Sequence, residues 1–226
     1  MASMQVLNED HPNHSAVRVI LRDQIKASAF WAIAERVRAP FRISKWEREG
    51  RAVPPPGVLK QRVVREYARR YGVRVLIETG THDGEMDFNL KNQFTRIVTI
   101  ELSPEYHARA VRRFARFPHI DCLRGDSGTL LPSVLAQITE PCLFWLDAHY
   151  SAGRTAKGDV ETPISTEVDA VLSHSVRNHV LLIDDARLFD GTHDYPMVAS
   201  LQEKVFEVRP DMSFSVEDDI IRITPK

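Results

Sequence analysis

The chain has 226 residues, which is enough to bury one sizeable core and favours a single domain of catalytic size with an accessory segment. Hydrophobic residues make up 43% of the sequence and charged residues 27%, so the composition excludes wholesale disorder and a fibrous class. The 30 lysines and arginines nearly cancel the 31 acidic residues, and a formal net charge of -1 provides no global field that would attract nucleic acid.

Two cysteines, Cys122 and Cys142, are too few for a disulfide framework and lack the close spacing of a structural zinc site. They predict buried thiols in a reducing compartment. No apolar run reaches the about 18 to 20 residues of a membrane span, and residues 1–10 lack the apolar segment of a signal peptide. We therefore expect a cytoplasmic protein that acts on a small molecule, with no nucleic acid or membrane partner, and a homodimer is an allowed assembly.

The first part of the chain has helical spacing with a proline interruption. Apolar residues recur at helical intervals over residues 17–38, three prolines follow at 54–56, and a second helical pattern over 59–71 ends at Gly72. Consecutive prolines cannot lie inside a helix, so they mark an extended connection. Residues 1–72 are predicted to form an N-terminal helical cap.

Three side chains of this cap could reach the ligand site of the following domain. Trp46, Lys60 and Gln61 are candidates for a lid that closes over it. Packing between the cap and the core is the simpler interpretation of Trp46.

From residue 73 onward, short β-branched runs alternate with helical stretches. The runs lie at 75–78, 97–101, 120–123, 143–147 and 180–184. Such alternation predicts a parallel sheet with helices on both faces, and two last runs at 213–216 and 220–224 predict an antiparallel hairpin. The predicted fold of residues 73–226 is α/β: a Rossmann-like, doubly wound, mostly parallel seven-stranded sheet with a C-terminal antiparallel hairpin.

Each of the five predicted parallel strands ends in, or leads into, an acidic residue. The acids are Glu78, Glu101, Asp126, Asp147, Asp184 and Asp185. Because open parallel sheets bind ligands at the carboxyl ends of their strands, these positions indicate a binding site. A single acid at a strand end is readily explained as part of the solvent-exposed surface. Acids at the ends of all five predicted parallel strands are poorly explained in that way.

The turn after the first strand reads Glu78-Thr79-Gly80-Thr81-His82-Asp83-Gly84. It has two glycines where the dinucleotide fingerprint requires three, and a carboxylate at Glu78 disfavours a pyrophosphate. A ligand with an ammonium and a sulfonium suits it better, while Gly80 and Gly84 allow the backbone to approach closely. Glu101, about 20 residues further on, is placed to accept the two hydroxyls of a ribose.

Neighbouring residues complete the predicted ligand site. Asp126 and Ser127 can meet an adenine edge. Thr81 and Leu102 adjoin the two acidic strand ends, and His82 is expected to shape the pocket rather than to act as a base.

The Glu-x-Gly-x-x-x-Gly turn, the acid after the second strand and the terminal hairpin resemble the class I S-adenosylmethionine-dependent methyltransferases, and the resemblance covers about residues 73–226. It implies S-adenosylmethionine (SAM) as the cofactor. The implied cofactor contacts are Glu78, Gly80, Thr81, His82, Gly84, Glu101, Leu102, Asp126, Ser127 and Asp147.

Within that superfamily, residues 144–153 and 182–185 look like the small bacterial macrocin O-methyltransferase group. In that group, acids after the fourth and fifth strands hold a magnesium ion. The resemblance makes Asp147, Asp184 and Asp185 candidate Mg²⁺ ligands, and three carboxylates suit that hard cation. The alternatives are that Asp184 caps a turn, that Asp185 binds loop backbone and that Asp147 contacts the amino-acid end of the cofactor. The loop after Asp147 is long and differs from the group.

Asp147 and the two residues shortly after it, His149 and Tyr150, are the candidate catalytic residues, since a ring there could serve as a general base or stabilise a cation. The predicted function is SAM-dependent methyl transfer to a hydroxyl or amine of a small molecule. One alternative is a lyase that releases methylthioadenosine from the cofactor without an acceptor. A second is a non-catalytic cofactor-binding protein.

Overall fold

The computed structural model describes residues 29–148 and 162–226. Ala39–Lys226 forms one compact unit and Met1–Arg38 another, in which the described part is the beginning of helix α2. The predicted residues His149 and Tyr150 lie outside the described ranges.

The elements are α2 (Ala29–Arg48), α3 (Gly57–Arg70), β1 (Val75–Thr79), α4 (Glu85–Leu90), β2 (Arg96–Glu101), α5 (Pro104–Phe114), β3 (Ile120–Arg124), α6 (Ser127–Leu135), β4 (Cys142–Leu146), α7 (Ile164–Ser173), β5 (Val180–Ile183), the 3-10 turn η1 (Ala186–Leu188), α8 (Val198–Val208), β6 (Met212–Glu217) and β7 (Ile220–Pro225).

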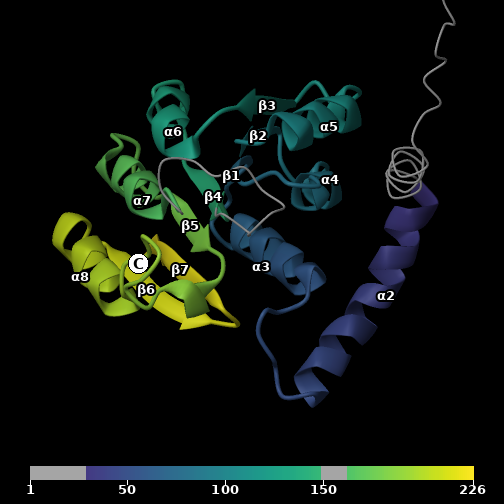
Figure 1. Ribbon diagram of the computed structural model, residues 1–226, viewed down its shortest axis with the longest axis horizontal. Coiled ribbons are helices and arrows are strands. Elements are labelled where there is room, and N and C mark those ends of the chain that lie inside the picture. The colour runs from purple at the N-terminus through teal and green to yellow at the C-terminus, as the bar shows by residue number, and fades with distance from the viewer. Residues whose placement is uncertain (1–28, 149–161) are drawn as a thin grey trace, which may run out of the picture. The chain divides into compact units, whose positions relative to one another are not determined.

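The strands form one seven-stranded sheet in the order β3-β2-β1-β4-β5-β7-β6 (Figure 1). Strands β1 to β5 pair in parallel, whereas β7 pairs antiparallel with β5 and with β6. The predicted fold class is confirmed. The order runs from β1 through β2 to β3 in one direction and from β4 to β5 in the other, so the topological switch point, where such sheets bind ligands, lies at the carboxyl ends of β1 and β4.

Helices cover both faces of the sheet, so the central strands are buried on both sides. One face packs against α6, α7 and α8, and the other against α3, α4 and α5. Successive residues of a strand point to opposite faces, so Leu143 and Trp145 of β4 pack on the α3 side, while Phe144 and Leu146 pack on the α7 side. This alternation decides where the side chains at the strand ends point.

Two helices begin or end elsewhere than the sequence pattern predicts. Helix α2 continues through Pro40 to Arg48, past the predicted end at residue 38, and its last turns bury Ile43 and Trp46 against Leu59. These apolar neighbours of Trp46 belong to the predicted cap itself, and its indole N–H also donates to the carbonyl of Ala52 at 2.6 Å, so packing between the cap and the core stays a prediction.

Helix α6 begins at Ser127, where the apolar pattern alone predicts a start near Leu130, because the Asp126 side chain caps it and accepts from the Thr129 amide at 2.9 Å. The division into a cap over 1–72 and a domain over 73–226 stays a prediction.

The two thiols are free; Cys142 is buried, as expected, whereas Cys122 is half-buried, and burial raises the pKa of each to about 12. Within residues 29–148 and 162–226, no helix combines the length and the apolar character that a membrane span requires.

The C-terminal hairpin offers a matched test of the fold. Ile221 of β7 is fully buried, and its cross-strand partner Val216 of β6 is 46% exposed. Ile221→Ala should lower the free energy of unfolding by about 2 to 5 kcal/mol because it leaves a cavity in the core. Val216→Ala should change it by about 0.5 kcal/mol or less. Urea unfolding of both variants measures the difference, and equal losses would mean that the hairpin does not pack on β5 as described.

Candidate functional site

The turn after β1 lies against the end of β4. The Asp147 amide donates to the Thr79 carbonyl at 3.1 Å, and Gly80, at φ +84°, follows directly. A Cβ atom on Gly80 would lie 2.5 Å from the Asp147 carbonyl oxygen, and one on Gly84 would lie 2.9 Å from the Phe114 ring. Both glycines are therefore required by the close approach of the chain itself.

Glu101, at the end of β2, is held rigidly beside this turn. It is buried, and its two carboxylate oxygens accept from the amides of His82 at 2.7 Å and of Ser103 at 2.8 Å. Each oxygen has a second acceptor position, so a ribose diol can still bind. The His82 ring lies on Tyr106, with 4.4 Å between ring centroids.

Glu78 points into the protein, on the face that α4 covers. Its carboxyl group accepts from the Thr99 hydroxyl at 2.8 Å, and the Thr99 hydroxyl lies 2.6 Å from that of Thr81. Burial, together with the charge of Asp87, raises the pKa of Glu78 well above its usual range. The structure thus places Glu78 beneath the turn, and its predicted contact with a cofactor stays a prediction.

The third strand leads to the start of α6, as expected. Asp126 is occupied as the helix cap, Ser127 is buried and Leu102 is half-buried. Glu167 of α7, which the sequence analysis missed, is fully buried near Ser127 and Thr79. Burial raises the pKa of Glu167 to about 7, and neither of its carboxylate oxygens has a hydrogen-bond partner among the described residues.

The predicted acidic cluster exists. Asp147, Asp184 and Asp185 each offer a carboxylate oxygen, and these oxygens lie within 4.8 Å of one another. The Asp184 side chain is buried, and its Oδ1 has no hydrogen-bond partner among the described residues. Burial and the charge of Asp147 raise the pKa of Asp184 to about 8, although Lys60 opposes this shift. A cation in this cluster would relieve the repulsion.

Lys60 of α3 supplies a cation. Its ammonium donates to Asp184 Oδ2 and lies 3.7 Å from Asp185 Oδ1. Burial alone would lower the pKa of Lys60, but the charges of Asp184 and Asp147 outweigh it and raise that pKa. Lys60 is therefore a charged member of the site.

Asp185 is fixed by the turn of the C-terminal hairpin. Its backbone is left-handed, with φ 56°, and its carboxylate accepts from the Arg187 guanidinium at 2.8 Å. Arg187 also pairs with the buried Asp219, whose Oδ1 accepts from the Arg187 amide at 2.8 Å. The hairpin therefore holds the acidic turn in place.

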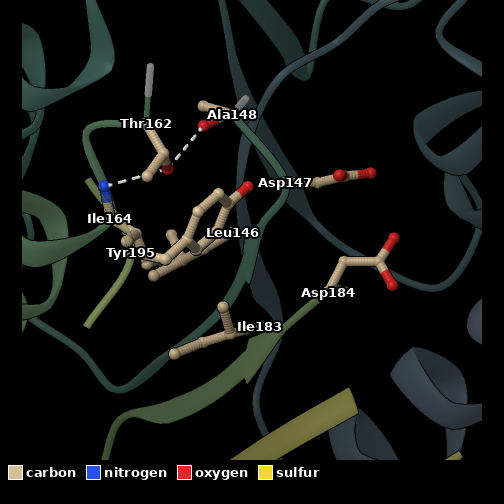
Figure 2. A pocket seen from close by; sticks show the side chains of 8 residues that line it. All are labelled: Leu146, Asp147, Ala148, Thr162, Ile164, Ile183, Asp184 and Tyr195. Carbon is tan, nitrogen blue, oxygen red and sulfur yellow. Dashed lines mark hydrogen bonds between the residues drawn. The ribbon is translucent and has the colours of Figure 1, made fainter. Parts of the chain in front are cut away.

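A small pocket adjoins the ends of β4 and β5 (Figure 2). The carboxyl groups of Asp147 and Asp184 extend to one side of the strand ends, away from Ile164. Thr162 anchors the start of α7, since its hydroxyl donates to the Ala148 carbonyl at 3.2 Å and accepts from the Ile164 amide at 3.3 Å. The pocket-lining residues are Leu146, Asp147, Ala148, Thr162, Ile164, Ile183, Asp184 and Tyr195.

Lys60, predicted only as a lid residue, and Glu167, which was missed, both leave a signal in the sequence. Lys60 precedes Val64 and Ala68 at intervals of four, and Glu167 falls between the buried Ile164 and Val171 of the same helix face. A charged residue in an apolar helical stripe indicates a buried partner. Nothing in the local sequence indicates that Asp219 pairs with Arg187.

Several solved structures share the fold of this chain. The O-methyltransferase TomG from Streptomyces achromogenes, in complex with SAM, is 19% identical over 86% of this chain and 88% of its own, with a TM-score of 0.55. An O-methyltransferase from Bacillus cereus, in complex with S-adenosylhomocysteine (SAH), is 17% identical over 91% and 97%, with a TM-score of 0.56. An SAH-bound methyltransferase from Podospora anserina is 15% identical over 100% of both chains, with a TM-score of 0.54.

The chain has the class I methyltransferase fold. No protein-family model and no curated protein matches its sequence. In this methyltransferase fold, Glu101 and Asp147 occupy the ends of the two strands that flank β1.

Glu167 generates a pH prediction. The folded protein keeps the Glu167 proton up to about pH 7, whereas an ordinary glutamate has a pKa of 4.5. The folded state thus binds more protons, and this contribution to the free energy of unfolding is lost as pH rises from about 4.5 to about 7. Glu167→Gln should therefore gain about 3 kcal/mol relative to the unmutated chain across that window.

Denaturant titrations at several pH values measure this difference, with Glu66→Gln on the exposed side of α3 as the control. Parallel stability curves for Glu167→Gln and the unmutated chain would contradict the buried, protonated state of Glu167.

Proposed function

We propose that this chain is a SAM-dependent methyltransferase that acts on a hydroxyl or amine of a small molecule. The observation that supports it best is the placement of Glu101 and Asp147 on either side of the β1 turn, at the switch point of a fold whose solved examples include SAM and SAH complexes. With its ribose bound to Glu101 and its amino-acid end near Asp147, the cofactor would lie across Gly80.

The rigidity of the turn suits this cofactor. Because Glu101 accepts from two backbone amides, its carboxylate keeps one orientation before any ligand arrives. Because the chain at Gly80 touches the Asp147 backbone, the two contact points keep a constant separation. Preorganisation of this kind lowers the entropy lost on binding.

Methyl transfer needs little more than alignment. The acceptor oxygen or nitrogen forms a bond to the methyl carbon while the carbon–sulfur bond breaks, its electrons return to sulfur and the acceptor loses a proton to solvent or to a nearby base. Holding nucleophile, carbon and sulfur in line can provide most of the acceleration.

Magnesium assistance, which the sequence predicts, is not part of this proposal, because Lys60 already engages the carboxylates that would hold the ion. Asp147, Asp184 and Asp185 would hold the ion, and their hard oxygen donors suit it. When bound, Mg²⁺ would acidify an acceptor hydroxyl. In this structure, an incoming ion would have to displace Lys60 from Asp184.

Calorimetry with SAM and with SAH tests the proposal, and binding in the micromolar range is the expected result. Incubation with SAM and candidate acceptors, followed by product analysis, should yield SAH. Release of methylthioadenosine without an acceptor would instead select the lyase. Binding of a nicotinamide dinucleotide, with neither SAM nor SAH bound, would contradict the proposed cofactor.

Glu101 provides a residue-level test. Glu101→Ala should weaken cofactor binding by about 1 to 3 kcal/mol because two ribose hydroxyls lose a charged acceptor. Glu105→Ala, on the exposed first turn of α5, is the control and should leave the affinity unchanged. An unchanged dissociation constant in Glu101→Ala would show that the carboxylate does not meet the ligand.

A further inference from the structure

Helix α3 directs one lysine toward the sheet. Lys60, Val64 and Ala68 are spaced four residues apart and so form one stripe of the helix, and Val64 and Ala68 are almost fully buried against the sheet. A lysine at the end of such a stripe requires a partner for its charge, because an unpaired buried ammonium is very unfavourable.

The strand ends provide that partner on the same face. Asp147 follows Leu143 and Trp145 at intervals of two, and Asp184 follows Val180 and Leu182 in the same way. These apolar residues pack in the core that α3 covers, so the alternation of a strand directs both carboxylates toward α3. In Figure 2 the two carboxyl groups do lie on the same side of their strands.

The contacts match this placement. The Lys60 side chain is 17% exposed and that of Asp184 only 1%, and the ammonium donates to Asp184 Oδ2. Asp185 Oδ1 lies 3.7 Å from the same nitrogen. An ammonium has three N–H donors, so one lysine can serve more than one carboxylate of the cluster.

We propose that the Lys60 ammonium is the resident cation of the Asp147–Asp184–Asp185 cluster and takes the place of a divalent metal ion. Mg²⁺ needs nearly octahedral oxygen coordination at about 2.0 to 2.1 Å, and Lys60 already engages Asp184 Oδ2 and repels a second cation. The cluster then needs no ion from solution. Among the described residues, the three acids of the cluster face two bases, Lys60 and Arg187, and this excess of acids favours the positively charged sulfonium of the proposed cofactor.

This inference rests on the proposed function only for its link to the sulfonium, and its test measures metal binding directly. Mn²⁺ is titrated into the unmutated chain, Lys60→Met and Lys45→Met, and free Mn²⁺ is followed by electron paramagnetic resonance. Lys45 is 69% exposed and provides the matched loss of charge. The unmutated chain and Lys45→Met should show no saturable binding.

Lys60→Met should gain about tenfold or more in Mn²⁺ affinity, because removal of the ammonium leaves the carboxylates to the ion. Adding Asp184→Asn should abolish the gain, and Lys60→Arg should keep the ion out. If SAM binds, its turnover by the unmutated chain should be the same in chelator as in Mg²⁺.

Saturable Mn²⁺ binding by the unmutated chain that is lost in Asp184→Asn would overturn the proposal, and this result does not depend on whether Lys60→Met folds. A folded Lys60→Met, verified by circular dichroism, that binds no Mn²⁺ would overturn it as well. Failure of SAM to bind in calorimetry would refute the proposed function and leave the metal result intact, so the two failures are distinguishable.

Discussion

Like charges at the ends of β4 and β5 impose the constraint that organises this structure. Asp147, Asp184 and Asp185 bring three carboxyl groups within 4.8 Å, one of them almost fully buried. Such a group of acids is stable only if protons, donors or a cation offset the repulsion. Two elements far apart in the sequence offset this repulsion. Lys60 of helix α3 pairs with Asp184, and Asp219 of the C-terminal hairpin holds Arg187, which pairs with Asp185.

The turn after β1, residues 80–84, is closely packed against the end of β4 that carries Asp147. Gly80 contacts the Asp147 backbone, so the turn and the acidic strand end move together. Glu101 on the other side of β1 is tied to the turn through the His82 amide. A cofactor that spans the switch point would thus find both of its polar ends already positioned relative to the cluster, which is the arrangement that favours alignment-based chemistry.

Much of this could be predicted from the sequence, because alternation and strand-end position are local properties. The seven strands and the hairpin follow from short apolar runs, and the gathering of Asp147 with Asp184 follows from the acids that come after two of these runs. Other features depend on neighbours distant in sequence. The Thr99 hydroxyl that donates to Glu78 lies 21 residues away, and the partner of Lys60 lies 124 residues away. The extension of α2 past Pro40 depends on burial of Trp46 against Leu59, which the local pattern does not reveal.

The dependence of Asp185 on Asp219 has a consequence for biogenesis. The ribosome makes β5 and its acidic turn before β6 and β7, so a nascent chain that ends at residue 190 lacks the aspartate that anchors Arg187. Until the hairpin emerges and pairs with β5, the left-handed residue at the turn has no tether from that side. The acidic cluster would therefore be completed late in co-translational folding. A released fragment without the hairpin would keep strands β1 to β3 but would lack the Asp219 contact that holds Arg187 beside Asp185.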